Sequence, residues 1–168
     1  MYTSHKRNRR SSLVHSHRYA AASAAWSVLS PASATFLPLA IQRGVEALYG
    51  GSTYGTGLKK WRESGIAFNA GKINVPFLIQ AADREYFLSL ENYMALKNAG
   101  KPVEMHRFVD EYHVKWQPAH RFVVYNRNVD WFNFWLRDVE NPIPADADQN
   151  ARWRELRKQQ IANLAARK

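Results

Sequence analysis

The sequence predicts an α/β fold, with parallel strands flanked by helices. Residues 75–81 form a short, continuous apolar run, which is typical of a strand buried on both faces. A helical pattern follows at residues 86–98, a second strand pattern at residues 103–109, and a long helical pattern from Pro118. Strand, helix, strand and helix in this order indicate a right-handed parallel βαβ unit.

Each of these elements has its own signal. Pro76 stands near the start of the first strand, where proline is tolerated. Gly100 and Pro102 end the first helix. The apolar side chains of that helix recur at helical spacing, at Phe87, Leu90, Tyr93, Met94 and Leu96. The second strand alternates between two sets of side chains, as a strand with two different faces does.

The second helix begins at Pro118, because proline suits the first turn of a helix. Its apolar side chains repeat every three or four residues, and we expect this stripe to face the core. The stripe consists of Phe122, Tyr125, Val129, Phe132 and Leu136.

The rest of the chain divides around this unit. Residues 1–12 have no periodic pattern and are expected to form a disordered basic leader. Residues 20–29 are small and apolar, and their periodicity does not distinguish a strand from a helix. Residues 30–57 read as loop or cap material with a short helix near residues 39–49. We assign residues 13–140 to one incomplete α/β domain.

Residues 141–168 follow a proline-rich linker and predict an appended amphipathic helix. Asp146 and Asp148 stand near its start and basic residues near its end, an order that suits the helix dipole. We expect this helix to dock on the parent domain. Binding to a membrane or to a partner is the less favoured role.

Charge and composition limit the function classes. The chain has 168 residues, a formal net charge of +10 and no cysteine, so it has no disulfide or thiolate metal site. No acidic residue precedes Glu46, and basic residues gather at both ends. Such ends can bind nucleic acid electrostatically. No nucleic-acid fold signature accompanies them, so solvated tails are the favoured interpretation and no specific nucleic-acid partner is expected.

No apolar run reaches the roughly 18 residues that cross a bilayer, so no membrane span is expected. The N-terminal region has a partial export signal, with basic residues at 6–10 and small residues at 32–34. His15, His17 and Arg18 interrupt it. We therefore expect a cytoplasmic protein, with a secreted or periplasmic one as the alternative.

The residues that suggest chemistry follow the two strands. Asp83 and Glu85 come directly after the first strand, and His113 lies in the loop after the second. Parallel strands bring the loops at their carboxyl ends together. In a serine hydrolase, a carboxylate orients a histidine that takes the proton of the nucleophile. The plainer alternative is that these are ordinary polar loop residues.

A histidine repeat invites a metal interpretation, since His106, His113 and His120 stand seven residues apart. They fall on a strand, a loop and a helix, so the repeat implies no shared face. No metal-binding spacing such as His-Glu-x-x-His occurs. We predict neither a metal nor a cofactor.

Three motifs suggest a family. They are the run at 79–86, Gly100-Lys101-Pro102-Val103-Glu104-Met105, and Asp110-Glu111-Tyr112-His113-Val114-Lys115-Trp116-Gln117-Pro118. With the helix motif at 130–136, they resemble the C-terminal part of the prolyl oligopeptidase-like serine peptidases. Within that group the chain is most similar to the lasso peptide isopeptidases. The resemblance covers about three quarters of the chain and implies the C-terminal part of an α/β-hydrolase fold.

The resemblance also implies roles. His113 would be the catalytic base of a peptidase acting on a peptide substrate. Asp83 would be the acid by the pattern of most of the family. Glu85 would be the acid by the pattern of the isopeptidase branch, and it is slightly favoured. Asp110 and Glu111 lie in the histidine's own loop and are weaker candidates.

The departure from the family concerns the nucleophile. The family places its serine in a Gly-x-Ser-x-Gly turn, but residues 1–10 contain no glycine. Ser4 lacks the small neighbours of that turn, and Ser52 has glycine on one side only. We therefore expect a truncated hydrolase without N-terminal strands or nucleophile, inactive alone. An open sheet edge at residues 20–29 would favour self-association. The alternative is a non-catalytic basic binding module.

Overall fold

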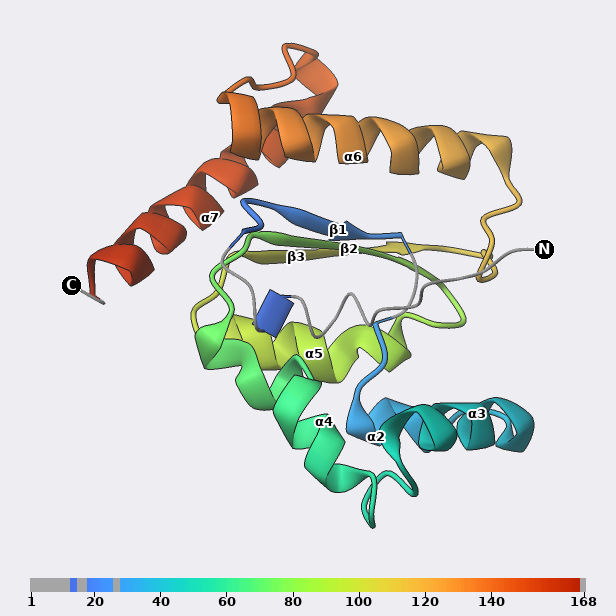
Figure 1. Cartoon of the computed structure of the whole chain (residues 1–168). Coiled ribbons are helices and arrows are strands. Elements are labelled where there is room, and N and C mark those ends of the chain that lie inside the picture. Colours follow the sequence, from blue (N-terminus) through green and yellow to red (C-terminus); the bar gives the residue numbers. More distant parts are fainter. Residues whose placement is uncertain (1–12, 15–17, 26–27, 167–168) are drawn as a thin grey trace.

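The computed structural model describes residues 13–14, 18–25 and 28–166, so the predicted basic leader lies outside the described residues. Its three strands are β1 (Ala22–Ala24), β2 (Phe77–Ala82) and β3 (Val103–Phe108). They form one parallel sheet in the order β1-β2-β3. Figure 1 shows helix α6 across one face of this sheet and helix α5 across the other. The α/β prediction, with parallel strands and flanking helices, is confirmed.

Strand β2 is the centre of the fold, and all six of its residues are buried. Its side chains alternate between the two faces, as a strand requires. Phe77, Ile79 and Ala81 join the core cluster on the α5 side, while Leu78 joins the aromatic cluster under α6. Gln80, on the α6 side, donates a hydrogen bond to the Asn128 side chain at 3.0 Å. Burial on both faces explains why the sequence shows a continuous apolar run here.

Helix α5 (Phe87–Asn98) connects β2 to β3, close to its predicted bounds. Its buried residues are Leu88, Ser89, Asn92 and Leu96, so half of this face is polar. Ser89 accepts a hydrogen bond from the Val28 backbone at 2.7 Å, and Asn92 donates to the Val28 carbonyl at 2.8 Å. The helix is followed by Gly100 in the left-handed conformation, with φ of +67°. The polar face therefore fixes the chain that follows β1.

The segment between β1 and β2 is helical and lies below the sheet in Figure 1. It contains α2 (Pro31–Ala34), α3 (Leu39–Tyr49), α4 (Leu58–Ser64) and the 3-10 helix η1 (Ala67–Lys72). The helix expected near residues 39–49 is confirmed. Tyr49 and Trp61 stack with ring centroids 3.7 Å apart and form a small core of their own.

Helix α6 (Pro118–Arg137) begins at the predicted proline, but the prediction of its buried face was wrong. The buried residues are Val124, Trp131 and Phe134. Four of the five predicted stripe residues are more than half exposed: Phe122, Tyr125, Val129 and Leu136. This helix has apolar side chains on two faces, and periodicity does not say which one meets the sheet.

A short 3-10 helix, η2 (Pro144–Asp146), leads into helix α7 (Ala147–Ala165). Trp153 of α7 is 1% exposed and packs with Trp131, Phe134 and Leu78. Its indole N–H donates to Glu104 of β3 at 2.5 Å. The helix therefore docks on the sheet and on α6, as expected from the sequence. Within the described ranges, no helix is long and apolar enough to cross a membrane.

Candidate active site

The predicted acids and the predicted histidine lie on loops at the carboxyl ends of β2 and β3. Glu85 sits in the turn after β2, where its backbone N–H donates to the Ala82 carbonyl at 3.0 Å. His113 lies in the loop between β3 and α6. The two strands are parallel and paired in register, so these loops emerge at one edge of the sheet.

The structure brings His113 and Glu85 into contact. The Nδ1 atom of His113 lies 2.9 Å from one carboxylate oxygen of Glu85 and 3.1 Å from the other. The carboxylate accepts, so this contact favours the tautomer with the proton on Nδ1. The side chain of His113 is 62% exposed and that of Glu85 is 21% exposed. Within the part of the chain that the structure describes, the second ring nitrogen of His113 has no hydrogen-bond partner.

Asp83 has a different environment. One of its carboxylate oxygens lies 3.3 Å from Arg107 Nε, and the other accepts a long hydrogen bond of 3.5 Å from the Asp110 backbone. Among the described residues, no hydrogen bond or ion pair joins Asp83 to His113. Asp83 thus links the ends of β2 and β3, while Glu85 contacts the histidine.

Glu111 organises the loop that carries His113. It is fully buried and accepts hydrogen bonds from the backbone N–H groups of Trp116, at 2.8 Å, and Gln117, at 3.1 Å. It also contacts His120 Nδ1 at 2.9 Å. Burial by itself would raise the pKa of Glu111, but the bonds from Trp116, His120 and Gln117 lower it below its usual value. Glu111 thereby caps α6, whose own N-cap side chain makes no capping bond.

Sequence reasoning gave Glu111 only a weak catalytic candidacy and missed this structural role. The available signal was an acidic side chain a few residues before a proline-initiated helix, where it can meet free N–H groups. Asp110, beside it, adopts φ of +53°, a left-handed conformation that Asp tolerates better than most residues. This residue turns the chain from β3 into the loop.

Lys115 ties the same loop to the sheet. It is 7% exposed, and its ammonium group donates to the Gln80 carbonyl at 2.9 Å and to the Ala25 carbonyl. Burial lowers the pKa of Lys115, and the nearby charges of Glu85 and Glu111 oppose that change. Glu111 and Lys115 therefore both hold the loop, one through its carboxylate and the other through its ammonium group. His113 projects from this fixed loop.

The three histidines of the seven-residue repeat occupy separate places, each beside its own glutamate. His106 lies 2.5 Å from Glu104, and His120 lies against Glu111. Among the described residues, no group of three His, Cys, Asp or Glu side chains is arranged to hold a metal ion.

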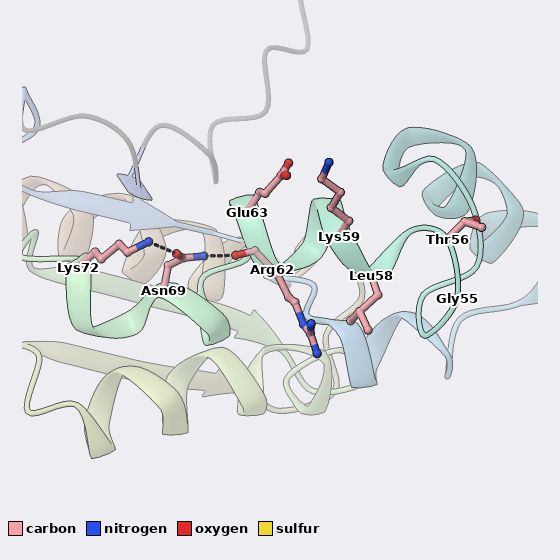
Figure 2. A pocket seen from close by; sticks show the side chains of 8 residues that line it. All are labelled: Gly55, Thr56, Leu58, Lys59, Arg62, Glu63, Asn69 and Lys72. Atoms are coloured by element: carbon pink, nitrogen blue, oxygen red, sulfur yellow. Dashed lines mark hydrogen bonds between the residues drawn. The ribbon is translucent and has the colours of Figure 1, made fainter.

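A cavity of about 600 Å³ lies elsewhere, along α4 and η1. Figure 2 shows Lys59 and Glu63 pointing to one side of α4 and Arg62 pointing away from them. Neither His113 nor either predicted acid lines this cavity. The wall side chains diverge, so we assign no chemistry to the cavity.

Comparison with known proteins identifies relatives. No protein-family model matches the chain. It is 42% identical to the lasso peptide isopeptidase AtxE2 of Asticcacaulis excentricus over 151 residues, which is 86% of this chain and 21% of AtxE2. The chain is a homologue of this lasso peptide isopeptidase. The resemblance to the lasso peptide isopeptidases is thereby confirmed, and the chain spans about a fifth of its relative's length.

Solved structures agree with this relationship. The apo structure of the AtxE2 isopeptidase matches with a TM-score of 0.79 at 39% identity, covering 90% of this chain and 23% of that one. A serine-to-alanine variant of AtxE2 with Astexin3-dC4 bound matches equally well. An acylaminoacyl peptidase in complex with a chloromethyl ketone, 20% identical with a TM-score of 0.63 over 80% of this chain and 23% of that one, shares the fold.

The structure offers His113 no nucleophile among the residues that it describes. No hydrogen bond joins this histidine to a serine hydroxyl there. Ser52 lies in the turn between α3 and α4, where its carbonyl accepts from the Gly55 and Gly57 backbone. Ser4 lies outside the described residues.

Proposed function

We propose that this chain carries the histidine and the acid of a serine-type isopeptidase site, with His113 as general base and Glu85 as its orienting carboxylate. The contact of His113 Nδ1 with both oxygens of Glu85 supports this assignment most directly. In such a site, the carboxylate holds the ring and stabilises the imidazolium that forms. The free ring nitrogen then takes a proton from a serine hydroxyl.

The favoured acid is Glu85 and not Asp83. Asp83 is engaged by Arg107 and by the backbone of Asp110, two contacts that hold the strand ends together. In this arrangement neither carboxylate oxygen of Asp83 is hydrogen-bonded to the ring of His113. The glutamate side chain is one methylene longer and reaches the loop of His113 from the turn after β2.

The bond cleaved would be an amide between a peptide N-terminus and an acidic side chain. This proposal comes from the homology to an isopeptidase and from the relative's structure with Astexin3-dC4 bound. The serine attacks the amide carbon, His113 passes the proton to the leaving amine, and water then hydrolyses the acyl-enzyme.

Alone, the chain should not perform this reaction. A histidine and a carboxylate without a serine leave no activated nucleophile. The backbone donors of an oxyanion hole contribute several kcal/mol more, on the order of 3 kcal/mol for each donor. We therefore assign residues 13–140 to one part of a catalytic domain, with residues 141–168 as an appendage that packs on it.

The alternative of a basic binding module has less support. The basic side chains of α7 are engaged by acidic ones within the chain. Arg152 pairs with Glu104, Arg154 with Glu140, Arg157 with Asp138 and Lys158 with Glu155. Charges paired in this way are less available to phosphates than a free basic stripe would be.

The test of the proposed pair is the tautomer of His113, read from its ring ¹⁵N chemical shifts at a pH where the ring is neutral. We expect the Nδ1-protonated form in the wild type and a mixture in Glu85→Gln. Asp83→Asn is the matched control and should leave the tautomer unchanged. A tautomer that responds to Asp83→Asn and ignores Glu85→Gln would reverse the assignment.

A further inference from the structure

The turn that carries Glu85 is attached to strand β3 on both sides of this residue. Before it, a carboxylate oxygen of Asp83 lies 3.3 Å from Nε of Arg107. After it, the guanidinium group of Arg107 lies over the ring of Tyr86, with 5.1 Å between the guanidinium carbon and the ring centroid. Arg107 belongs to β3, so one side chain of the neighbouring strand contacts both ends of the turn. The side chain of Glu85 therefore extends from a backbone that is held in place.

The loop that carries His113 is buried at two points and exposed between them. Glu111 and Lys115 are buried and bonded to the backbone. The three residues between them project into solvent, since Tyr112 is 52% exposed, the side chain of His113 is 62% exposed and Val114 is 71% exposed. Side chains with so little packing are oriented by the few directed contacts that they and their neighbours make. The orientation of the His113 ring therefore depends on such contacts.

One directed contact joins the two residues that come immediately before Glu85 and His113. The guanidinium carbon of Arg84 lies 4.8 Å from the centroid of the Tyr112 ring. A cation within about 6 Å of an aromatic ring face is attracted to it. Arg84 precedes Glu85 and Tyr112 precedes His113. The cation–π contact and the carboxylate–imidazole contact therefore join the same two segments at adjacent positions.

We propose that Arg84 and Tyr112 are positioning residues, whose cation–π contact keeps the ring of His113 against the carboxylate of Glu85. This inference rests on the proposed function, in which the carboxylate sets the tautomer of the ring. Neither residue exchanges a proton, because both act through the backbone that they share with Glu85 and His113. A cation–π contact at an exposed site shifts an equilibrium by about two- to fivefold. An effect of this size is expected on the orientation of the ring.

The experiment measures the ratio of the Nδ1-protonated to the Nε2-protonated form of His113 in the full chain. Ring ¹⁵N chemical shifts report this ratio at a pH where the ring is neutral. Tyr112→Leu removes the aromatic face and leaves the charge of Arg84, while Arg84→Met removes the charge and leaves the face. We expect each variant to lower the ratio by about two- to fivefold, because the ring then leaves Glu85 more often. Both positions are exposed, so the fold should persist, which circular dichroism verifies.

Three further variants separate positioning from a general loss of structure. Tyr112→Phe keeps the aromatic face and should keep the wild-type ratio. The double variant Arg84→Met/Tyr112→Leu should lose no more than either single variant, because both substitutions remove the same contact. Lys97→Met is the matched control. It removes the cation of a second pair of this kind on α5, where the Lys97 ammonium lies 5.8 Å from the Tyr93 ring centroid, and it should leave the ratio unchanged.

A loss in Tyr112→Phe equal to that in Tyr112→Leu would overturn the proposal, because the effect would then belong to the hydroxyl group. Additive losses in the double variant would overturn it too. Glu85→Gln distinguishes this proposal from the proposed function. A ratio that responds to Glu85→Gln but to neither Arg84→Met nor Tyr112→Leu would reject the positioning role and keep the catalytic pair. A ratio that ignores Glu85→Gln would reject the pair itself and the positioning role with it.

Discussion

The two sides of helix α6 differ in how completely they are covered. On the face toward the sheet, Trp131 and Phe134 are each at most 1% exposed and form a closed aromatic cluster with Leu78 of β2 and Trp153 of α7. On the face away from the sheet, Tyr125 and Val129 are more than half exposed. Apolar composition alone therefore does not set burial in this helix. Contact with the sheet and with α7 decides which apolar stripe becomes core.

The covered side should be the more sensitive to substitution. We expect Trp153→Ala to cost about 3–5 kcal/mol of unfolding free energy, through the cavity left between Trp131 and Phe134 and the lost hydrogen bond to Glu104. A guanidinium chloride titration, monitored by circular dichroism, measures this loss of unfolding free energy. A loss below about 1 kcal/mol would mean that α7 is only loosely docked.

The unfolding free energy should depend on Glu111, in the loop of His113, nearly as strongly as on Trp153. Glu111→Ala leaves the N–H groups of Trp116 and Gln117 and the ring of His120 without their acceptor. We expect a loss of about 3 kcal/mol, measured by the same titration. Glu111→Gln, which keeps one acceptor oxygen, should lose less. Equal losses in the two variants would show that volume and not hydrogen bonding holds the loop.

Acid should destabilise the chain through Glu104 and Glu111. Burial alone would raise the pKa of each, but hydrogen bonds and nearby cations lower it below the ordinary value of 4.5. A lowered carboxyl pKa stabilises the fold above the pKa of the unfolded chain, and this stability is lost as the pH falls through the folded value. We expect unfolding free energies to decline below about pH 4.5. Glu111→Gln should flatten that decline, and an unchanged pH profile would refute the role given to this carboxyl.

Substitutions on the exposed face of α6 should change the unfolding free energy least. Val129→Asp should change the unfolding free energy by no more than about 0.5 kcal/mol, because the side chain is exposed. The same substitution should reduce any self-association of the chain through this side, measured by sedimentation. A loss of several kcal/mol would show that Val129 is buried in solution.

Much of the fold could be predicted from the sequence. The buried apolar run at β2, Gly100 after α5 and Pro118 at the start of α6 act locally, so their elements lie close to the predicted positions. The buried face of α6 could not be predicted, because it depends on α7 packing from far along the chain. The polar face of α5 was hidden for a similar reason: Ser89 and Asn92 are buried by bonds to Val28.

The candidate site was predictable in part. The strand order predicted that His113 lies near two carboxylates. The choice between Asp83 and Glu85, which are two positions apart, depends on three-dimensional contacts. Arg107 lies on β3 beside the end of β2, and this pairing draws Asp83 away from the histidine. Sequence spacing contains no information on that contact.

The most direct test of the account is fluorophosphonate labelling of the isolated chain, read by intact mass and peptide mapping. We propose that His113 and Glu85 form a base and its orienting acid without a serine of their own. We therefore expect no label on any serine after prolonged exposure, in the wild type as in His113→Ala. A label at Ser52 or Ser4 in the wild type that disappears in His113→Ala would contradict it, because a serine of this chain would then be activated by His113.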